Sequence, residues 1–181
     1  MTPTRFSPLQ RGLHWLMAAA IIAMLFIGVG MVTTVQPRYL ALIAVHKPLG
    51  IAILLLALLR IGVRLRRGAP PLPADLPPIQ RFGAHASHLV LYGLMVAMPL
   101  IGWAMLSAGG YPVVLGGVLR LPPIAPHDDA LQAVLRTAHT WLAYALFLTV
   151  IAHLGAALMH ALIRRDGVFQ TMAPWSRANR A

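Results

Sequence analysis

The sequence has no cysteine and no glutamate, and its only acidic residues are four aspartates among 181 residues. Without cysteine the chain forms no disulfide, no thiolate metal site, no iron–sulfur cluster and no haem attached through a Cys-x-x-Cys-His motif. With so few carboxylates, the chain has almost no residues that could serve as the paired general acid and base of a hydrolase, which argues against this class of enzyme. Any metal or cofactor must therefore be held by His, Met or oxygen ligands.

Charged residues are also scarce, at 10% of the chain, whereas hydrophobic residues make up 59% and the mean hydropathy is +0.73. This composition argues strongly against an ordinary soluble domain. The net charge of +11 is not spread along a basic helix or interleaved with aromatics, so we expect no nucleic acid partner. The cations stand instead at the ends of apolar stretches, as in membrane proteins, and membrane lipid is the expected surrounding.

Four apolar stretches are long enough to cross a bilayer core of roughly 30 Å. We predict spans at about residues 13–35, 41–63, 88–107 and 134–163. The predicted fold is therefore all-α, a single integral membrane four-helix bundle over residues 1–181. A cleaved signal peptide is the alternative for the first stretch, but that stretch exceeds the usual apolar region of about 7 to 15 residues.

The segments between these stretches are rich in proline and glycine. Residues 68–78 hold five prolines and are predicted to be a surface linker. Within the loop at 108–126, residues 111–119 are apolar but too short to span, and we expect them to lie on the membrane surface. Asp128 and Asp129 are predicted to form the cap and the first turn of the fourth helix.

The cations are distributed unevenly between the two sides of such a bundle. With both termini on one side, that side holds eleven of the fifteen positive charges. The other side holds the remaining four, namely Arg38, Lys47, Arg120 and Arg136. Since cytoplasmic loops carry the excess of Lys and Arg, we predict a bacterial inner-membrane protein with both termini in the cytoplasm.

Histidines inside apolar helices are the most informative residues. The predicted topology places His14 and His153 near the inner surface and His46 and His139 near the outer one. His139 and His153 are 14 residues apart, so they share a helix face within about 40° at levels about 21 Å apart. Two haems stacked across the membrane need such an arrangement, because each iron takes a histidine from either side. The alternatives are interhelical hydrogen bonds, and zinc or copper, although closed zinc sites need about four clustered ligands.

Further polar residues lie near the inner surface. Arg60 follows His46 by the same interval of 14 residues, and it either neutralises a haem propionate or extends only to the interface. His85, His88 and His160 either line a quinone pocket or are merely solvated.

The order and spacing of these residues resemble the bacterial cytochrome b561 family of four-helix, di-haem membrane proteins, and within it the superoxide oxidase type. The resemblance rests on Leu-Gln-Arg-Gly-Leu-His-Trp around His14, on Ala-His-Ala-Ser-His ending at His88, on residues 99–102, and on the other three histidines. It implies two non-covalent haem b groups, one ligated by His14 and His153 and the other by His46 and His139.

The resemblance also implies an oxidoreductase that passes electrons from superoxide at the outer face to ubiquinone. Lys47, Arg120 and Arg136 are then candidates for a positive mouth that attracts the anion, or else they bind propionates or fix helix ends. Two other functions stay open. The chain is alternatively an electron-transfer subunit linking the quinone pool to a redox partner protein, or a non-redox transporter of metal or haem.

Overall fold

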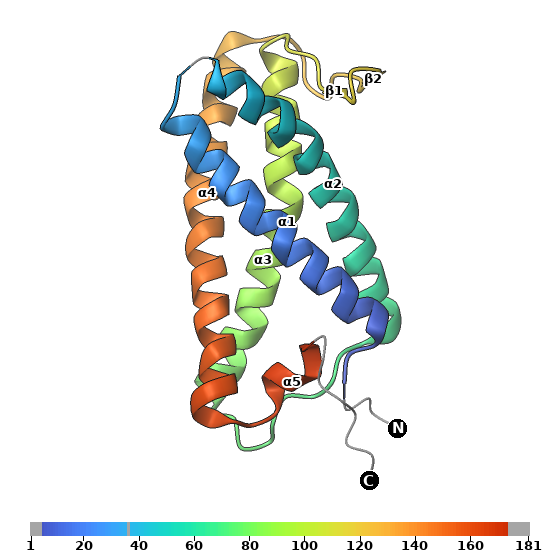
Figure 1. The fold of residues 1–181 in the computed structure, drawn as a ribbon, viewed down its shortest axis with the longest axis vertical. Coiled ribbons are helices and arrows are strands. Elements are labelled where there is room, and N and C mark those ends of the chain that lie inside the picture. The colour runs from blue at the N-terminus through green and yellow to red at the C-terminus, as the bar shows by residue number, and fades with distance from the viewer. Residues whose placement is uncertain (1–4, 36, 174–181) are drawn as a thin grey trace.

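A computed structural model describes residues 5–35 and 37–173, and it confirms a bundle of four long helices (Figure 1). These helices are α1 (Pro8–Val32), α2 (Arg38–Arg67), α3 (Pro78–Ala108) and α4 (Asp129–Leu158). A π-helical turn, η1 (Met159–Arg164), continues α4 and is followed by the short helix α5 (Val168–Met172). The strands in the described ranges are β1 (Val114–Leu115) and β2 (Leu119–Arg120), which pair antiparallel.

The outer surface of the bundle is apolar. Helices α1, α2 and α3, and α4 together with η1, are each long and apolar enough to cross a membrane. Large side chains such as Phe26, Trp141 and Leu148 are 74%, 69% and 65% exposed. A soluble protein rarely leaves so many large apolar groups in water, so the chain is a multi-pass membrane protein.

Local sequence signals explain where the helices begin. The Asp128 carboxylate accepts a hydrogen bond from the Leu131 N–H at 2.8 Å, which confirms the predicted cap of α4. Helix α3 begins ten residues before the predicted span, at Pro78, because proline at the first helical position loses no intrahelical hydrogen bond. Helix α4 begins at Asp129, as the predicted cap requires, and the span predicted at 134–163 begins five residues later. The first turns of α3 are too polar to continue its apolar stretch, so the prediction from apolar runs did not include them.

The closely packed core occupies the middle of the bundle. It consists of Met17 and Ile21 from α1, Ile53 and Ala57 from α2, and Met95 from α3. Helix α1 packs on α2, α2 on α3, and α3 on α4. Along the helices this core lies between the levels of the inner and outer histidines, and it therefore separates the two sites described below.

The two ends of the bundle differ. At one end α5 is fastened beside α1, because the Trp15 Nε1–H donates to the Met172 carbonyl at 3.0 Å and the Arg11 Nη1 donates to the Ala173 carbonyl at 3.3 Å. At the other end, residues 111–119, expected on the membrane surface, contribute to the β1–β2 hairpin. Figure 1 shows this hairpin projecting sideways from the end opposite α5. We call these the α5 end and the hairpin end.

Candidate functional site

Two histidines from different helices face each other toward the α5 end. The rings of His14 in α1 and His153 in α4 have centroids 6.3 Å apart and planes inclined by 62°. Both side chains are half-buried. The structure therefore brings together the two histidines that the sequence predicted at the inner level. We call them the inner pair.

A second pair, which we call the outer pair, lies toward the hairpin end. The rings of His46 in α2 and His139 in α4 also have centroids 6.3 Å apart, with planes inclined by 65°. Helix α4 thus contributes one histidine to each pair from a single face. The equal separation at two levels points to two sites built on the same plan.

Neither pair lies at a tight contact between helix backbones. In the described part of the chain α4 packs closely on α3, whereas its backbone makes few or no close approaches to α1 or α2. Both pairs nevertheless join α4 to one of those two helices. Each pair of imidazoles therefore joins two helices whose backbones are not in close contact, and a flat group that inserts between helices needs such a spacing.

The spacing of each pair fits an iron held between two imidazoles. A metal–nitrogen bond of about 2 Å on each side puts the ring centroids roughly 6 Å apart. Imidazole suits iron, and bis-histidine ligation needs only two protein ligands. Within residues 5–35 and 37–173 no three His or Asp side chains are grouped to hold a metal ion, so the arrangement does not match a closed zinc site.

Unpaired nitrogens in the two pairs also fit a ligand. The Nδ1 atoms of His14 and His46 are buried and have no hydrogen-bond partner among the described residues. A buried polar atom without a partner is costly, and native structures rarely keep one without a reason. Histidines at these positions thus fit the haem b that the sequence led us to expect.

The outer pair has a further structural support that sequence reasoning missed. Gly102 of α3 lies against the His139 ring, and a Cβ at this position would be 3.2 Å from the His139 Cε1. The absence of a side chain is therefore what lets the ring sit against α3. Only the packing of α3 on α4 reveals this, because Gly102 and His139 are far apart in the sequence.

The three predicted quinone residues occupy different surroundings. The ring centroid of His88 lies 5.5 Å from that of His153, and the His88 Nδ1 is 2.7 Å from the Ala84 carbonyl. The Nδ1 therefore donates, and Nε2 is the acceptor in the neutral ring. His160 lies in η1 and is buried, whereas His85 is exposed and lines a pocket at the start of α3.

His160 belongs to a polar network that ties η1 to the linker between α2 and α3. Its Nδ1 is 2.7 Å from Asp166 Oδ2, to which the Arg164 Nε also donates at 3.0 Å. The Arg164 Nη2 in turn donates to Asp75 at 2.9 Å. Burial alone would raise the pKa of Asp166, but the hydrogen bonds from His160, Arg164 and the Val168 N–H outweigh it and hold that pKa below its usual value.

Because the pKa of Asp166 is lower in the folded protein than in the unfolded chain, its carboxylate stabilises the fold at neutral pH. This contribution is lost as the pH falls through the lowered pKa. We expect Asp166→Asn to lower the apparent Tm at pH 7, and the difference from wild type to shrink below about pH 4. Asp129→Asn, an exposed change at the start of α4, is the control. A difference that stays constant with pH would contradict this role.

Arg60 lies near the inner pair, in a crevice that also includes Leu13. Its Nε donates to the Tyr92 hydroxyl at 3.2 Å, and its guanidinium carbon lies 5.7 Å from the centre of the Tyr92 ring. Arg60 and Tyr92 line a narrow crevice together with Gln10 and Leu13, the residue before His14. Tyr92 therefore holds the guanidinium at the α5 end of the inner site.

Removing this cation should make reduction at the inner site less favourable, because an added electron loses a nearby positive charge. We expect Arg60→Leu to lower the midpoint potential of a haem held by His14 and His153 by on the order of 50 mV, and to reduce the occupancy of that site. Tyr92→Phe should have a smaller effect of the same sign. Redox titration followed by optical spectra measures both. Unchanged potential and occupancy in Arg60→Leu would leave Arg60 with an interfacial role only.

The three cations predicted to form an anion mouth lie toward the hairpin end. Lys47 follows His46 in α2, Arg136 precedes His139 by about one turn in α4, and Arg120 lies in β2. Arg120 and Arg136 are exposed and Lys47 is half-buried. The positive charges therefore lie toward the same end of the molecule as the outer histidine pair.

Comparisons with known proteins agree with this arrangement. A model of the prokaryotic cytochrome b561 family matches residues 5–175. The chain is 30% identical over 176 residues to cytochrome b561 homolog 2 of Escherichia coli (strain K12), covering 94% of this chain and 92% of the relative. It is 32% identical over 175 residues to a probable superoxide oxidase, CybB, of Yersinia pestis, covering 96% and 98%. The chain belongs to the prokaryotic cytochrome b561 family, whose members bind haem b and transfer electrons in membranes.

Proposed function

We propose that this protein oxidises superoxide at the hairpin end and reduces ubiquinone toward the α5 end. Two superoxide anions each give up one electron and leave as two molecules of dioxygen. The quinone gains those two electrons and two protons and becomes quinol. The observation that carries this proposal is the pair of matched histidine sites at two levels of one bundle, supported by the likeness to a probable superoxide oxidase.

The chain's main contribution to the proposed reaction is its two pairs of histidines. His14 and His153 would hold one haem b, and His46 and His139 would hold the other. Haem b, when bound, supplies reversible one-electron chemistry that no side chain of this protein offers. Met17, Ile21, Ile53, Ala57 and Met95 keep water out of the space between the two levels.

The charge pattern supports the proposed orientation. The α5 end would face the cytoplasm and the hairpin end the outside of a bacterial inner membrane, which puts the excess of arginine inside. Lys47, Arg120 and Arg136 would then attract superoxide from the outer aqueous phase. His88 and His160 are the groups we assign to the quinone, with protons reaching it from the cytoplasmic side.

If these cations attract superoxide, the rate of the reaction should depend on ionic strength. We expect Arg136→Gln to lower kcat/KM for superoxide several-fold at low salt, and the difference from wild type to fade near 1 M salt, where the Debye length is about 3 Å. Arg66→Gln, an exposed change at the other end of the bundle, should leave the rate unchanged. Stopped-flow rates over a salt series provide the measurement. An equal loss at all salt concentrations would contradict steering.

The function itself is tested by adding superoxide to purified protein with and without a soluble ubiquinone analogue. The proposal predicts saturable, protein-dependent formation of quinol that superoxide dismutase abolishes. Haem that is redox-active but untouched by superoxide would overturn this function in favour of an electron-transfer subunit that serves a partner protein. Ligand transport by protein without bis-histidine haem would favour a transporter instead.

A further inference from the structure

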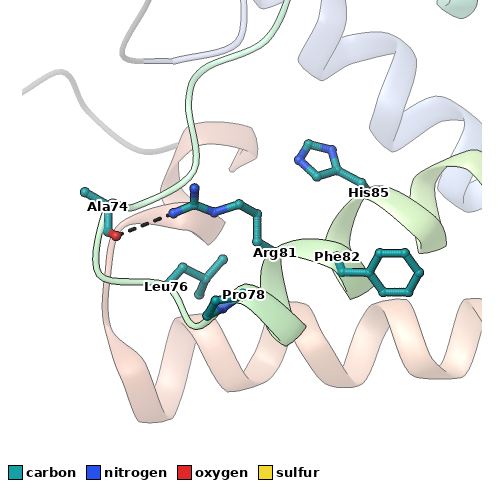
Figure 2. A pocket seen from close by; sticks show the side chains of 6 residues that line it. All are labelled: Ala74, Leu76, Pro78, Arg81, Phe82 and His85. Carbon is teal, nitrogen blue, oxygen red and sulfur yellow. Dashed lines mark hydrogen bonds between the residues drawn. The ribbon is translucent and has the colours of Figure 1, made fainter.

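A pocket of about 490 Å³ lies at the start of α3, near the α5 end of the bundle. Figure 2 shows the residues that line it, namely Ala74, Leu76, Pro78, Arg81, Phe82 and His85. The pocket is separate from the contacts made by His88 and His160, which point to His153 and Asp166.

Two polar side chains of the pocket come from consecutive turns of α3. Arg81 and His85 are four residues apart, so they lie on one face of the helix, and Figure 2 shows both extending from the same side. The Arg81 Nη2 makes long hydrogen bonds to the carbonyls of Ala74 (3.4 Å) and Pro73 (3.5 Å). Both bonds use one nitrogen, so the guanidinium fork keeps further donors for an anion.

The charge around the pocket favours an anionic ligand. None of the six lining residues is acidic. Asp75 is the neighbouring carboxylate in the sequence, and it accepts a hydrogen bond from the Arg164 Nη2 at 2.9 Å. The carboxylate is therefore already engaged by another cation, and Arg81 retains its charge for a different partner.

The surface beside the pocket is apolar. Ile79 and Phe82 are 75% and 70% exposed, and Leu89, two turns beyond Phe82, is 75% exposed. In a membrane-spanning bundle these side chains meet lipid rather than water. A ligand here would thus meet a cation on one side and hydrocarbon on the other.

We propose that this pocket binds the phosphate headgroup of an anionic phospholipid, with Arg81 and His85 contacting the phosphate and the acyl chains lying along Phe82 and Leu89. Basic pockets at the membrane boundary recognise lipid headgroups in this way. The proposal gives His85 a partner other than quinone. It does not depend on the reaction proposed above, because neither Arg81 nor His85 contacts a histidine of the two haem sites.

The test uses the full chain with its haem in nanodiscs of phosphatidylcholine containing increasing phosphatidylglycerol. Native mass spectrometry counts the phosphatidylglycerol molecules retained after the protein is released. We expect Arg81→Gln and His85→Gln each to lower the tightly retained fraction several-fold. Arg66→Gln is the matched control, since it removes an exposed cation at the same end outside the pocket, and it should retain lipid like wild type.

A phosphate competition and a second variant complete the test. Inorganic phosphate at millimolar concentration should not displace the lipid, and displacement would mean that the pocket takes a free anion instead. If Arg81→Gln does not fold, His85→Gln decides the question alone, because His85 makes no bond to the linker in the described structure. Equal loss of lipid in Arg66→Gln, or no loss in His85→Gln, would overturn the proposal.

Discussion

Replacing His153 by Ala should leave about half of the wild-type haem in the purified protein, because only the inner site loses a ligand. His14 then lacks the imidazole that lies opposite it in the bundle. His46 and His139 are untouched, since the two levels are separated by the core around Ile53. A haem count by the pyridine haemochromogen method, together with the optical difference spectrum, measures the change.

The reciprocal variant sharpens this test. His139→Ala should remove the outer haem and leave the inner one, so the remaining spectra of the two variants should add up to that of wild type. His127→Ala is the control, because His127 lies outside both pairs and its Nδ1 bonds only to the Ala108 carbonyl in the described structure. Loss of both haems from a folded single variant, or of neither, would contradict two independent sites.

The second large effect is expected at Gly102. A Cβ there would be 3.2 Å from the His139 Cε1, so Gly102→Ala must push the ring by a few tenths of an ångström. We expect that change to shift the spectrum of the outer haem, and the bulkier Gly102→Val to lower outer haem occupancy several-fold, while the inner haem is retained. Electron paramagnetic resonance of the oxidised protein distinguishes the two sites.

Gly93 supplies the matched control on the same helix. A Cβ at Gly93 meets no atom within 4 Å, so Gly93→Ala adds helix propensity without a clash. It should bind haem like wild type and unfold at the same or a slightly higher temperature. If Gly102→Val also binds haem like wild type, the contact between Gly102 and His139 does not position the ligand.

Helical periodicity explains why sequence reasoning could find the histidine pairs. The interval between His139 and His153 fixes a shared face and two levels, and the direction of each span decides which partner lies opposite. The Asp128 cap is equally local, since its acceptor and donor are three residues apart. Features that follow from helical periodicity and from the direction of each span were therefore predictable.

Features that depend on the detailed side-chain packing between distant segments were not predictable. The network of His160, Asp166 and Asp75 joins the π-helical turn to the linker. No local sequence pattern predicts that the two aspartates belong to it. The contact of Gly102 with His139 depends on how α3 packs against α4. The start of α3 at Pro78 was missed because its first turns, including Arg81 and His85, are too polar to count as membrane-spanning.

One chain of this protein is expected to hold two haem b groups, each between two histidines. The most direct test is the haem-to-chain ratio of the purified wild-type protein, measured together with its oxidised and reduced optical spectra. We expect two non-covalent haems per chain, both low-spin, as bis-histidine ligation requires. A ratio of one or zero, or a high-spin spectrum, would contradict it.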